Sequence, residues 1–286
     1  MQESGFVTKA SGEKCLYSEK KIRTSLLKSG ASEEQADFIL KEIKAKLFEG
    51  ISTKKIYDIA FSLLKKKSRY LAARYHLKKA IMELGPSGFP FEKYFSEILN
   101  RQGYKTKVGE IMQGQCVSHE IDVIAERENH YCIIECKYHN QRGTFSDVKI
   151  PLYINSRFKD VESTLKKLDN SKLYEGWVVT NTKFSFDAIQ YGNCVGLKLI
   201  GWDYPIKGSL KERIDTLGLY PITCLTSLTI AEKRRLLDHR IVLCSEICNN
   251  EKLLETMNIK PDRIYNVLKE AKQICSQLSN ELKVEC

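Results

Sequence analysis

The sequence lacks the features that would place the protein in a membrane or direct its export. It contains no run of about 18 apolar residues, the length that a membrane-spanning helix needs. Its first residues, MQESGFVTKASGEK, include no apolar stretch of the kind found in secretory signals. We therefore expect a cytoplasmic protein with no membrane partner.

Two common ligand motifs are also missing. The absence of a GxxxxGK[ST] loop argues against an ATP-hydrolysing enzyme of the P-loop type. No CxxC pair is present, and the spacings Cys116-x-x-His119 and Cys136-x-x-His139 stand alone, so a structural zinc site is disfavoured. The ten cysteines are scattered through apolar segments, which predicts free, buried thiols.

Internal repeats and low-complexity tracts are absent, while 42% of the 286 residues are hydrophobic. A chain of this length can form two or three small domains. The net charge is +10 and its excess is N-terminal, because residues 1–85 contain 18 Lys and Arg against 10 Asp and Glu. This basic segment is either a surface that attracts nucleic acid or a nucleotide, or a well-solvated helical surface, and charge alone does not decide.

The stretch His119–Lys137, HEIDVIAERENHYCIIECK, predicts two antiparallel strands. Apolar, partly β-branched runs at Ile121–Ala125 and Tyr131–Lys137 are separated by polar residues typical of a turn. If Glu128 and Asn129 form a two-residue loop, residues whose numbers sum to 257 lie opposite one another. The register of the hairpin is then determined.

This register predicts a cluster of charged side chains. Asp122 faces Glu135 across the ladder, and Lys137 shares a face with Glu135, whereas Cys136 points to the other side. Two close carboxylates repel one another, and a hard divalent cation such as Mg²⁺ would relieve the repulsion. The alternative is a cross-strand salt bridge on a solvated face.

The flanking residues bear a family resemblance. A helix is expected from Phe89, with an apolar stripe through Phe91 and Leu99, an early Glu92 off the stripe and an end near Gln102. A helix with an early Glu, then RQGY, then a strand with an Asp, then Glu-Cys-Lys resembles the PD-(D/E)xK nuclease superfamily. Within it, residues 86–205 resemble the Mrr-like restriction endonucleases.

The resemblance implies a mixed sheet flanked by helices and a metal-dependent endonuclease that hydrolyses DNA phosphodiester bonds. It implies that Asp122 and Glu135 bind Mg²⁺ or Mn²⁺, that Lys137 acts at the attacking water and that Glu92 is a supporting carboxylate. The metal site expected here comprises Asp122, Glu135 and Cys136.

Nearby residues suggest further contacts. Arg142, Lys149 and Arg157 follow the predicted active strands and either approach the DNA backbone or form ordinary surface. His119 either assists at the site or is a hydrogen-bonded structural histidine. A helix is expected at 161–173.

Residues 1–85 predict a β-hairpin followed by a helical bundle. The two strands flank a turn at Ser11-Gly12, and helices are expected at 18–30, 32–47, 53–65 and 69–84. The segments VTKxxG, KI, EGISTKKIYDIA and YLAARYHLKKA make this region resemble the ATP-cone, a nucleotide-binding regulatory domain.

The resemblance implies ATP or dATP as a regulatory ligand. Lys9 and Lys21 would contact phosphates, Thr53 and Tyr57 would lie near the base or sugar, and Lys78 or Lys79 would close the site. The full set of expected binding residues is Val7, Lys9, Gly12, Lys21, Ile22, Thr53, Tyr57 and Lys78. ATP-cones usually alter subunit association, so a nucleotide-dependent homo-oligomer is expected.

The sequence thus predicts a mixed α/β (α+β) protein with an ATP-cone at 1–85, a nuclease domain at 86–205 and a helical domain of unknown role at 206–286. A Gly- and Pro-rich joint at 84–88 marks the first boundary. The expected function is a nucleotide-regulated, metal-dependent endodeoxyribonuclease. The alternative is a nucleotide-sensing DNA-binding regulator without cleavage activity.

Overall fold

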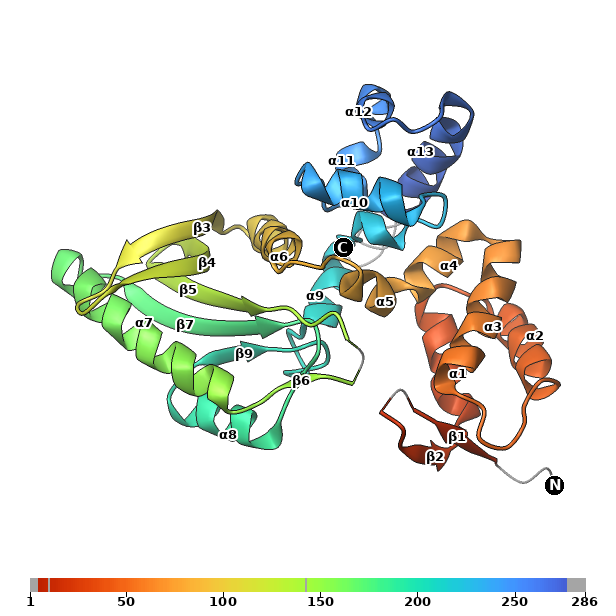
Figure 1. The fold of residues 1–286 in the computed structure, drawn as a ribbon, viewed down its shortest axis with the longest axis horizontal. Coiled ribbons are helices and arrows are strands. Elements are labelled where there is room, and N and C mark those ends of the chain that lie inside the picture. Colours follow the sequence, from red (N-terminus) through yellow and green to blue (C-terminus); the bar gives the residue numbers. More distant parts are fainter. Residues whose placement is uncertain (1–4, 10, 142, 277–286) are drawn as a thin grey trace, which may run out of the picture. The chain divides into compact units, whose positions relative to one another are not determined.

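The computed structural model describes residues 5–9, 11–141 and 143–276 and shows a mixed fold of helices and strands, as expected (Figure 1). No helix within these ranges is both long and apolar enough to cross a bilayer. All nine cysteines in the same ranges are free thiols, and five of them are buried. The expectation of free thiols is therefore confirmed for the described residues.

The chain forms two compact units. We call residues 81–219 and 237–242 the sheet unit. The helical unit comprises the described residues among 1–80 and 220–236, and those from 243 onward. The three domains expected from the sequence stay a prediction.

A mixed five-stranded sheet is the centre of the sheet unit (Figure 1). The first three strands in the order are antiparallel neighbours, and the last two run parallel to β5. The strand order is β3 (Lys105–Gln113), β4 (Ser118–Arg127), β5 (His130–Lys137), β7 (Leu173–Thr180) and β9 (Lys198–Ile200). Strand β3 was not predicted from the sequence.

The register of β4 and β5 is as predicted. Val123 lies opposite Ile134 and Arg127 lies opposite His130, so paired residue numbers sum to 257. Glu128 adopts a φ of 56°, the left-handed conformation that a tight two-residue turn requires. Asp122 is therefore one residue beyond the last pair, on the side of Glu135.

Helices cover both faces of the sheet (Figure 1). Helices α7 and α8 lie on one face and α6 lies on the other. A minor parallel pair, β6 (Phe145–Ser146) with β8 (Lys183–Phe184), lies outside the main sheet. The helices of this unit are α6 (Phe89–Arg101), α7 (Lys149–Leu168), α8 (Phe186–Cys194) and α9 (Leu210–Leu217).

Helix α7 is longer than expected. It begins at Lys149 and ends at Leu168, so the helix predicted at 161–173 is wrong at both ends. Pro151 lies in the first turn, where a missing N–H costs no hydrogen bond. Leu173 instead begins β7, because the chain turns at 169–172.

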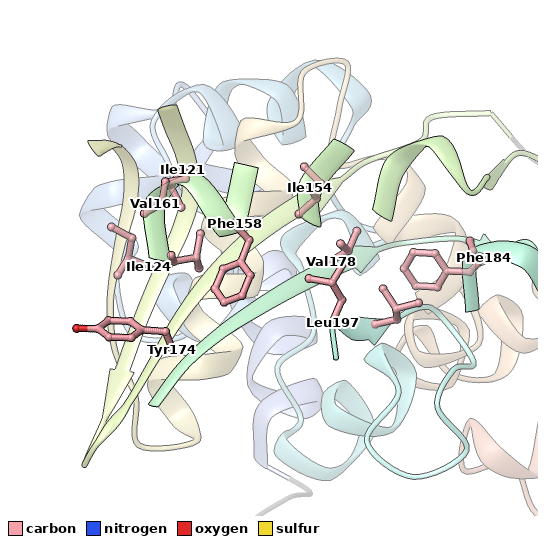
Figure 2. Packing of buried hydrophobic residues seen from close by; sticks show 12 residues of the cluster. Ile121, Ile124, Ile154, Phe158, Val161, Tyr174, Val178, Phe184 and Leu197 are labelled. Atoms are coloured by element: carbon pink, nitrogen blue, oxygen red, sulfur yellow. The ribbon is translucent and has the colours of Figure 1, made fainter. Parts of the chain in front are cut away.

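Apolar side chains of α7 and α8 meet those of the strands in one cluster (Figure 2). A Cβ at Gly176 of β7 would lie 2.8 Å from the Phe158 ring and 2.7 Å from Leu197, so the absence of a side chain allows α7 to approach the sheet closely. The cluster comprises Ile121, Ile124, Ile133, Ile154, Phe158, Val161, Tyr174, Val178, Phe184, Ala188, Leu197 and Leu199. This packing determines where the polar face of α7 lies.

The N-terminal part of the helical unit is a hairpin followed by helices. Ser18, Ser32, Ser52 and Ser68 each accept a hydrogen bond from a backbone N–H in the first turn of the next helix. Each such cap stabilises its helix by about 1 kcal/mol. The elements are β1 (Phe6–Thr8), β2 (Lys14–Leu16), α1 (Glu19–Lys28), α2 (Glu33–Lys44), α3 (Thr53–Lys67), α4 (Arg69–Tyr75) and α5 (Leu77–Met82).

The hairpin and the serine-capped helices agree with the sequence prediction, except that the helix expected at 69–84 is divided at His76. The C-terminal part of the chain is helical, as expected. Its elements are η1 (Ile222–Cys224), α10 (Ile230–Asp238), α11 (Cys244–Ile247), α12 (Glu251–Thr256) and α13 (Pro261–Ser276).

The C-terminal helices pack with the N-terminal ones inside the helical unit. The Thr223 hydroxyl donates to the Ala80 carbonyl at 2.7 Å, and α13 contacts α4. Glu270 of α13 is only 2% exposed, and its carboxylate accepts from the backbone N–H groups of Thr226 and Ser227 at 2.8 and 2.9 Å. This buried carboxylate fixes the loop that precedes α10.

We expect Glu270→Ala to lower the free energy of unfolding by about 2–4 kcal/mol, because two half-buried N–H donors lose the buried carboxylate that accepts from them. Urea denaturation measures the change. The exposed Glu255 on α12 provides the control, and Glu255→Ala should change stability by less than about 0.5 kcal/mol. Equal stability of the two variants would contradict this role for Glu270.

Candidate active site

Helix α6 positions Glu92. The apolar stripe of the helix is fully buried, and each large side chain in it stabilises the fold by about 1.5–3 kcal/mol. Glu92 lies in the first turn, off this stripe, and stays only half-buried. The buried stripe residues are Phe91, Tyr94, Phe95, Ile98 and Leu99.

The hairpin of β4 and β5 positions Asp122, Glu135 and Lys137. The Asp122 carboxylate accepts a hydrogen bond from the backbone N–H of Cys136 at 2.7 Å, which ties the end of β4 to β5. Both carboxylates are half-buried, and the Glu135 side chain is 14% exposed. The structure therefore brings together the two carboxylates that the register predicted.

Electrostatic effects show that Glu92 belongs to the same group. Burial raises the pKa of Glu92 to about 7, and the charges of Asp122 and Glu135 add to the shift. Burial also raises the pKa values of both Asp122 and Glu135. Three carboxyl groups thus share a poorly solvated place at the end of β5, where the charge of Asp122 also raises the pKa of Glu135.

Two cations partly offset this negative charge. Lys137 lowers the pKa values of Asp122 and Glu135 by its positive charge, so its ammonium lies within electrostatic reach of both. The Arg157 guanidinium, which comes from α7, donates to the Glu135 carboxylate at 2.6 Å. The sequence suggested Arg157 as a DNA contact or as ordinary surface, because its approach to Glu135 depends on the packing of α7 against the sheet.

Of the other residues expected near the site, Lys149 stays a predicted DNA contact and His119 makes a structural contact. Lys149 begins α7, where its backbone N–H donates to Asp147 at 3.0 Å, and Arg142 lies outside the described residues. His119 bonds to Asp160 at 2.8 Å. This contact agrees with the structural role considered for His119.

Asp160 fixes the turn between β3 and β4 and was not found from the sequence. Its carboxylate accepts from the backbone N–H groups of Cys116 and Val117 at 2.8 and 3.3 Å. The hydrogen bond to His119 is the largest cause that lowers the pKa of Asp160, to about 2. An Asp on a helix carries no signal for these contacts, because its partners are more than 40 positions away.

The carboxylates fit a hard divalent cation. Burial is the largest cause of their raised pKa values, so the ionised carboxylates are poorly solvated here, and Mg²⁺ is commonly held by one or two carboxylates and several waters. Among the described residues, no three His, Cys, Asp or Glu side chains form a complete metal cluster. The two carboxylates of Asp122 and Glu135 would therefore need other oxygen ligands.

Cys136 fits the metal site only through its backbone. Its thiol is 6% exposed, and burial raises its pKa well above the ordinary value, so it stays protonated at neutral pH. A protonated thiol is a poor ligand. The backbone carbonyl of Cys136 is the remaining oxygen donor at this position.

The residues expected to bind a nucleotide are spread over the hairpin and three helices. Val7 lines a cavity of about 760 Å³ in the helical unit, together with Lys44 and Phe48. The other expected residues, Lys9, Gly12, Lys21, Ile22, Thr53, Tyr57 and Lys78, are not among those that line it.

Some of these residues have contacts of their own. Lys9 forms an exposed ion pair with Glu13 at 3.0 Å, and the Tyr57 hydroxyl bonds to His76 at 2.7 Å. Gly12 has a φ of 83°, which suits the hairpin turn, and Thr53 is the first residue of α3. Lys21 and Lys78 are exposed.

We expect the stability of the metal-free protein to fall as the pH rises from about 5 to about 8. The folded state holds the Glu92 proton with a pKa of about 7 against the ordinary 4.5, so this contribution is complete below 4.5 and is lost as the pH rises through about 7. Thermal unfolding in EDTA at several pH values measures it.

The matched variants are Glu92→Gln, which should flatten the pH dependence, and Glu97→Gln on the same helix, which should leave it unchanged. An equally steep dependence in Glu92→Gln would show that another group is responsible.

Comparison with known proteins gives two family matches. Residues 85–203 match a family described as restriction endonuclease. Residues 220–275 match a family described as AF1548-like, C-terminal. The first match contains Glu92, Asp122, Glu135 and Lys137, so all four lie in the restriction endonuclease domain.

One relative and one solved structure each match about two thirds of the chain. An uncharacterized protein of Archaeoglobus fulgidus is 35% identical over 184 residues, which are 63% of this chain and 98% of the relative. The crystal structure of the protein of unknown function AF1548 is 34% identical, with a TM-score of 0.56, and the match covers 66% of this chain and 98% of that one. Identity at this level over almost the whole relative shows that the chain belongs to the AF1548-like family, and that its central segment is a restriction endonuclease domain.

Proposed function

We propose that this protein is a divalent-metal-dependent endodeoxyribonuclease that acts in the cytoplasm and whose activity responds to ATP or dATP. One observation carries the nuclease proposal. Asp122, Glu135 and Lys137 converge at the end of β5 inside a restriction endonuclease domain. Glu92 lies close enough to Asp122 and Glu135 for their negative charges to raise its pKa. Carboxylates beside an ammonium are the groups that metal-assisted phosphodiester hydrolysis needs.

In this proposal, Asp122, Glu135 and the Cys136 carbonyl hold Mg²⁺ or Mn²⁺. When bound, the ion supplies Lewis-acid stabilisation of the phosphate charge and favours ionisation of a water molecule. The Lys137 ammonium orients the attacking water and offsets charge on the phosphate oxygens. The water attacks phosphorus in line with the leaving 3′ oxygen.

Glu92 is suited to hold the proton that the water loses. In the metal-free protein its pKa of about 7 lies close to neutral pH, the range in which a general base is most effective, and a cation bound at Asp122 and Glu135 would favour its ionised, proton-accepting form. It comes from α6, on a different element from the metal-binding carboxylates. This separation allows one carboxyl to exchange protons while Asp122 and Glu135 remain ionised.

We propose that the hairpin and helices of residues 5–80 bind the nucleotide. The cavity of about 760 Å³ beside β1 is large enough for a ligand of this size, and Val7 is the one expected binding residue that lines it. Lys9 lies outside this lining and forms an exposed pair with Glu13; such pairs are weak, so its ammonium is available to a phosphate that extends beyond the cavity. Nucleotide binding would then shift the protein between oligomeric states, which couples the ligand to DNA cleavage.

The second candidate is a nucleotide-sensing DNA-binding regulator that does not cleave. The ion pair between Arg157 and Glu135 favours it, because the guanidinium already satisfies one of the proposed metal ligands. DNA binding that persists in EDTA, without cleavage under any nucleotide, would support this candidate. The intact set of Asp122, Glu135 and Lys137 is the reason for preferring the nuclease.

We expect the full chain to nick supercoiled plasmid in Mg²⁺ or Mn²⁺ and not in EDTA. Lys137→Ala and Glu135→Ala should each lower the rate by at least about 100-fold, because both remove groups that stabilise the transition state. Gel electrophoresis measures nicking, and thermal melting shows whether each variant is folded.

Lys183→Ala is the control, since this lysine forms an exposed pair with Asp203. Folded Lys137→Ala and Glu135→Ala proteins that nick at the rate of the control would refute the assignment.

We expect Lys9→Ala to weaken ATP or dATP binding by about tenfold, the effect of losing one phosphate contact. Isothermal titration of the full chain measures the affinity. The exposed Lys20, on α1, offers a control of equal charge, and Lys20→Ala should bind like the unchanged protein. Equal affinities for all three proteins would remove Lys9 from the site.

A further inference from the structure

Arg157 lies between the proposed active site and an open pocket. Its Nη1 donates to the Glu135 carboxylate at 2.6 Å and to the Glu120 carbonyl at 3.2 Å. Its Nη2 donates to the Tyr153 hydroxyl at 3.0 Å, and the guanidinium lies over the Tyr153 ring at 4.9 Å. These contacts hold the Arg157 guanidinium against Glu135, a proposed metal ligand.

The pocket on the other side gives the guanidinium a place to move. It has a volume of about 490 Å³ and is lined in part by Tyr153, Ser156, Arg157, Lys159 and Asp160. Tyr153 is 59% exposed, so its ring borders solvent. A phosphate that enters from this side would meet Arg157 and Lys159 on the same helix, α7.

The guanidinium is incompletely hydrogen-bonded where it now lies. The Nε of Arg157 is buried, and no described residue accepts from it. Glu135 is contacted by a single nitrogen, so the paired N–H groups that suit bidentate binding are not used together on one anion. Arg binds a phosphate best through such a pair, which makes a phosphodiester a better partner than this carboxylate.

Charge balance predicts that a divalent ion first displaces the Arg157 guanidinium from the carboxylates and that a phosphodiester then binds it. With Arg157 in place, two cations face the carboxylates of Asp122 and Glu135. A divalent ion on the same carboxylates would replace the guanidinium as the neutralising charge and repel it. The negative phosphodiester would then hold the released guanidinium.

We propose that Arg157 occupies the metal site in the resting protein, competes with the divalent ion for Glu135, and on release binds a DNA phosphate oxygen beside the site. This inference rests on the proposed function. Metal and DNA binding are then positively coupled through one side chain, since each favours the outward position of Arg157. Without DNA, the protein holds its metal weakly.

The test measures Mn²⁺ binding by electron paramagnetic resonance on the full chain without DNA. We expect Arg157→Met to bind Mn²⁺ about tenfold more tightly than the unchanged protein, because the competing cation is gone. The same variant should bind a DNA duplex about tenfold more weakly in Ca²⁺ by fluorescence anisotropy, because a phosphate contact is lost. Arg157→Lys, which keeps the charge, should recover part of the DNA affinity.

Lys166→Met, on the same helix and paired with Glu162, is the matched control and should change neither affinity. Equal Mn²⁺ affinity in folded Arg157→Met and unchanged protein would overturn the inference while leaving the nuclease proposal intact. If Arg157→Met does not fold, the same comparison is made with Arg157→Lys, which should bind Mn²⁺ within about threefold of the unchanged protein and DNA more weakly; unchanged DNA affinity would then overturn it. Mn²⁺ binding that Glu135→Gln leaves unaltered would instead refute the metal site itself.

Discussion

Repulsion among three carboxyl groups at the end of β5 is the constraint on which the site depends. Glu92, Asp122 and Glu135 are half-buried together, and each has a raised pKa because water cannot solvate its charge fully. The fold tolerates the arrangement because β4 and β5 are hydrogen-bonded up to this point and because Lys137 and Arg157 supply positive charge. Negative charge is thus held at one place, where the divalent cation that we propose would offset it.

Two helices on opposite faces of the sheet contribute Glu92 and Arg157 to the site. Helix α6 is anchored by its fully buried apolar stripe and holds Glu92, the carboxyl whose pKa lies near neutrality. Helix α7 is held close to the sheet by contact with Gly176 and carries Arg157. In the proposed mechanism, proton exchange at Glu92 and cation exchange at Arg157 therefore take place on different helices, while the strands keep Asp122 and Glu135 in place.

The sequence predicted what depends on local periodicity and missed what depends on distant packing. The register that brings Asp122 to Glu135 followed from alternation and a two-residue turn, whereas Glu92 was suggested by the resemblance to the PD-(D/E)xK nucleases. Strand β3 was missed because it is an edge strand in which no residue is fully buried and a glycine lies at its centre. The contacts of Arg157 with Glu135 and of Asp160 with the β3–β4 turn join residues 22 or more positions apart, for which no local pattern exists.

The central claim is that these carboxylates support metal-dependent hydrolysis of DNA by water. Cleavage of a DNA duplex in ¹⁸O-labelled water with Mg²⁺, followed by mass spectrometry of the ends, tests it directly. The account predicts 3′-hydroxyl ends and 5′-phosphates that carry one ¹⁸O atom, and no products in EDTA. DNA that stays intact with Mg²⁺ and with Mn²⁺ at every nucleotide concentration, or 5′-phosphates without the label, would contradict it.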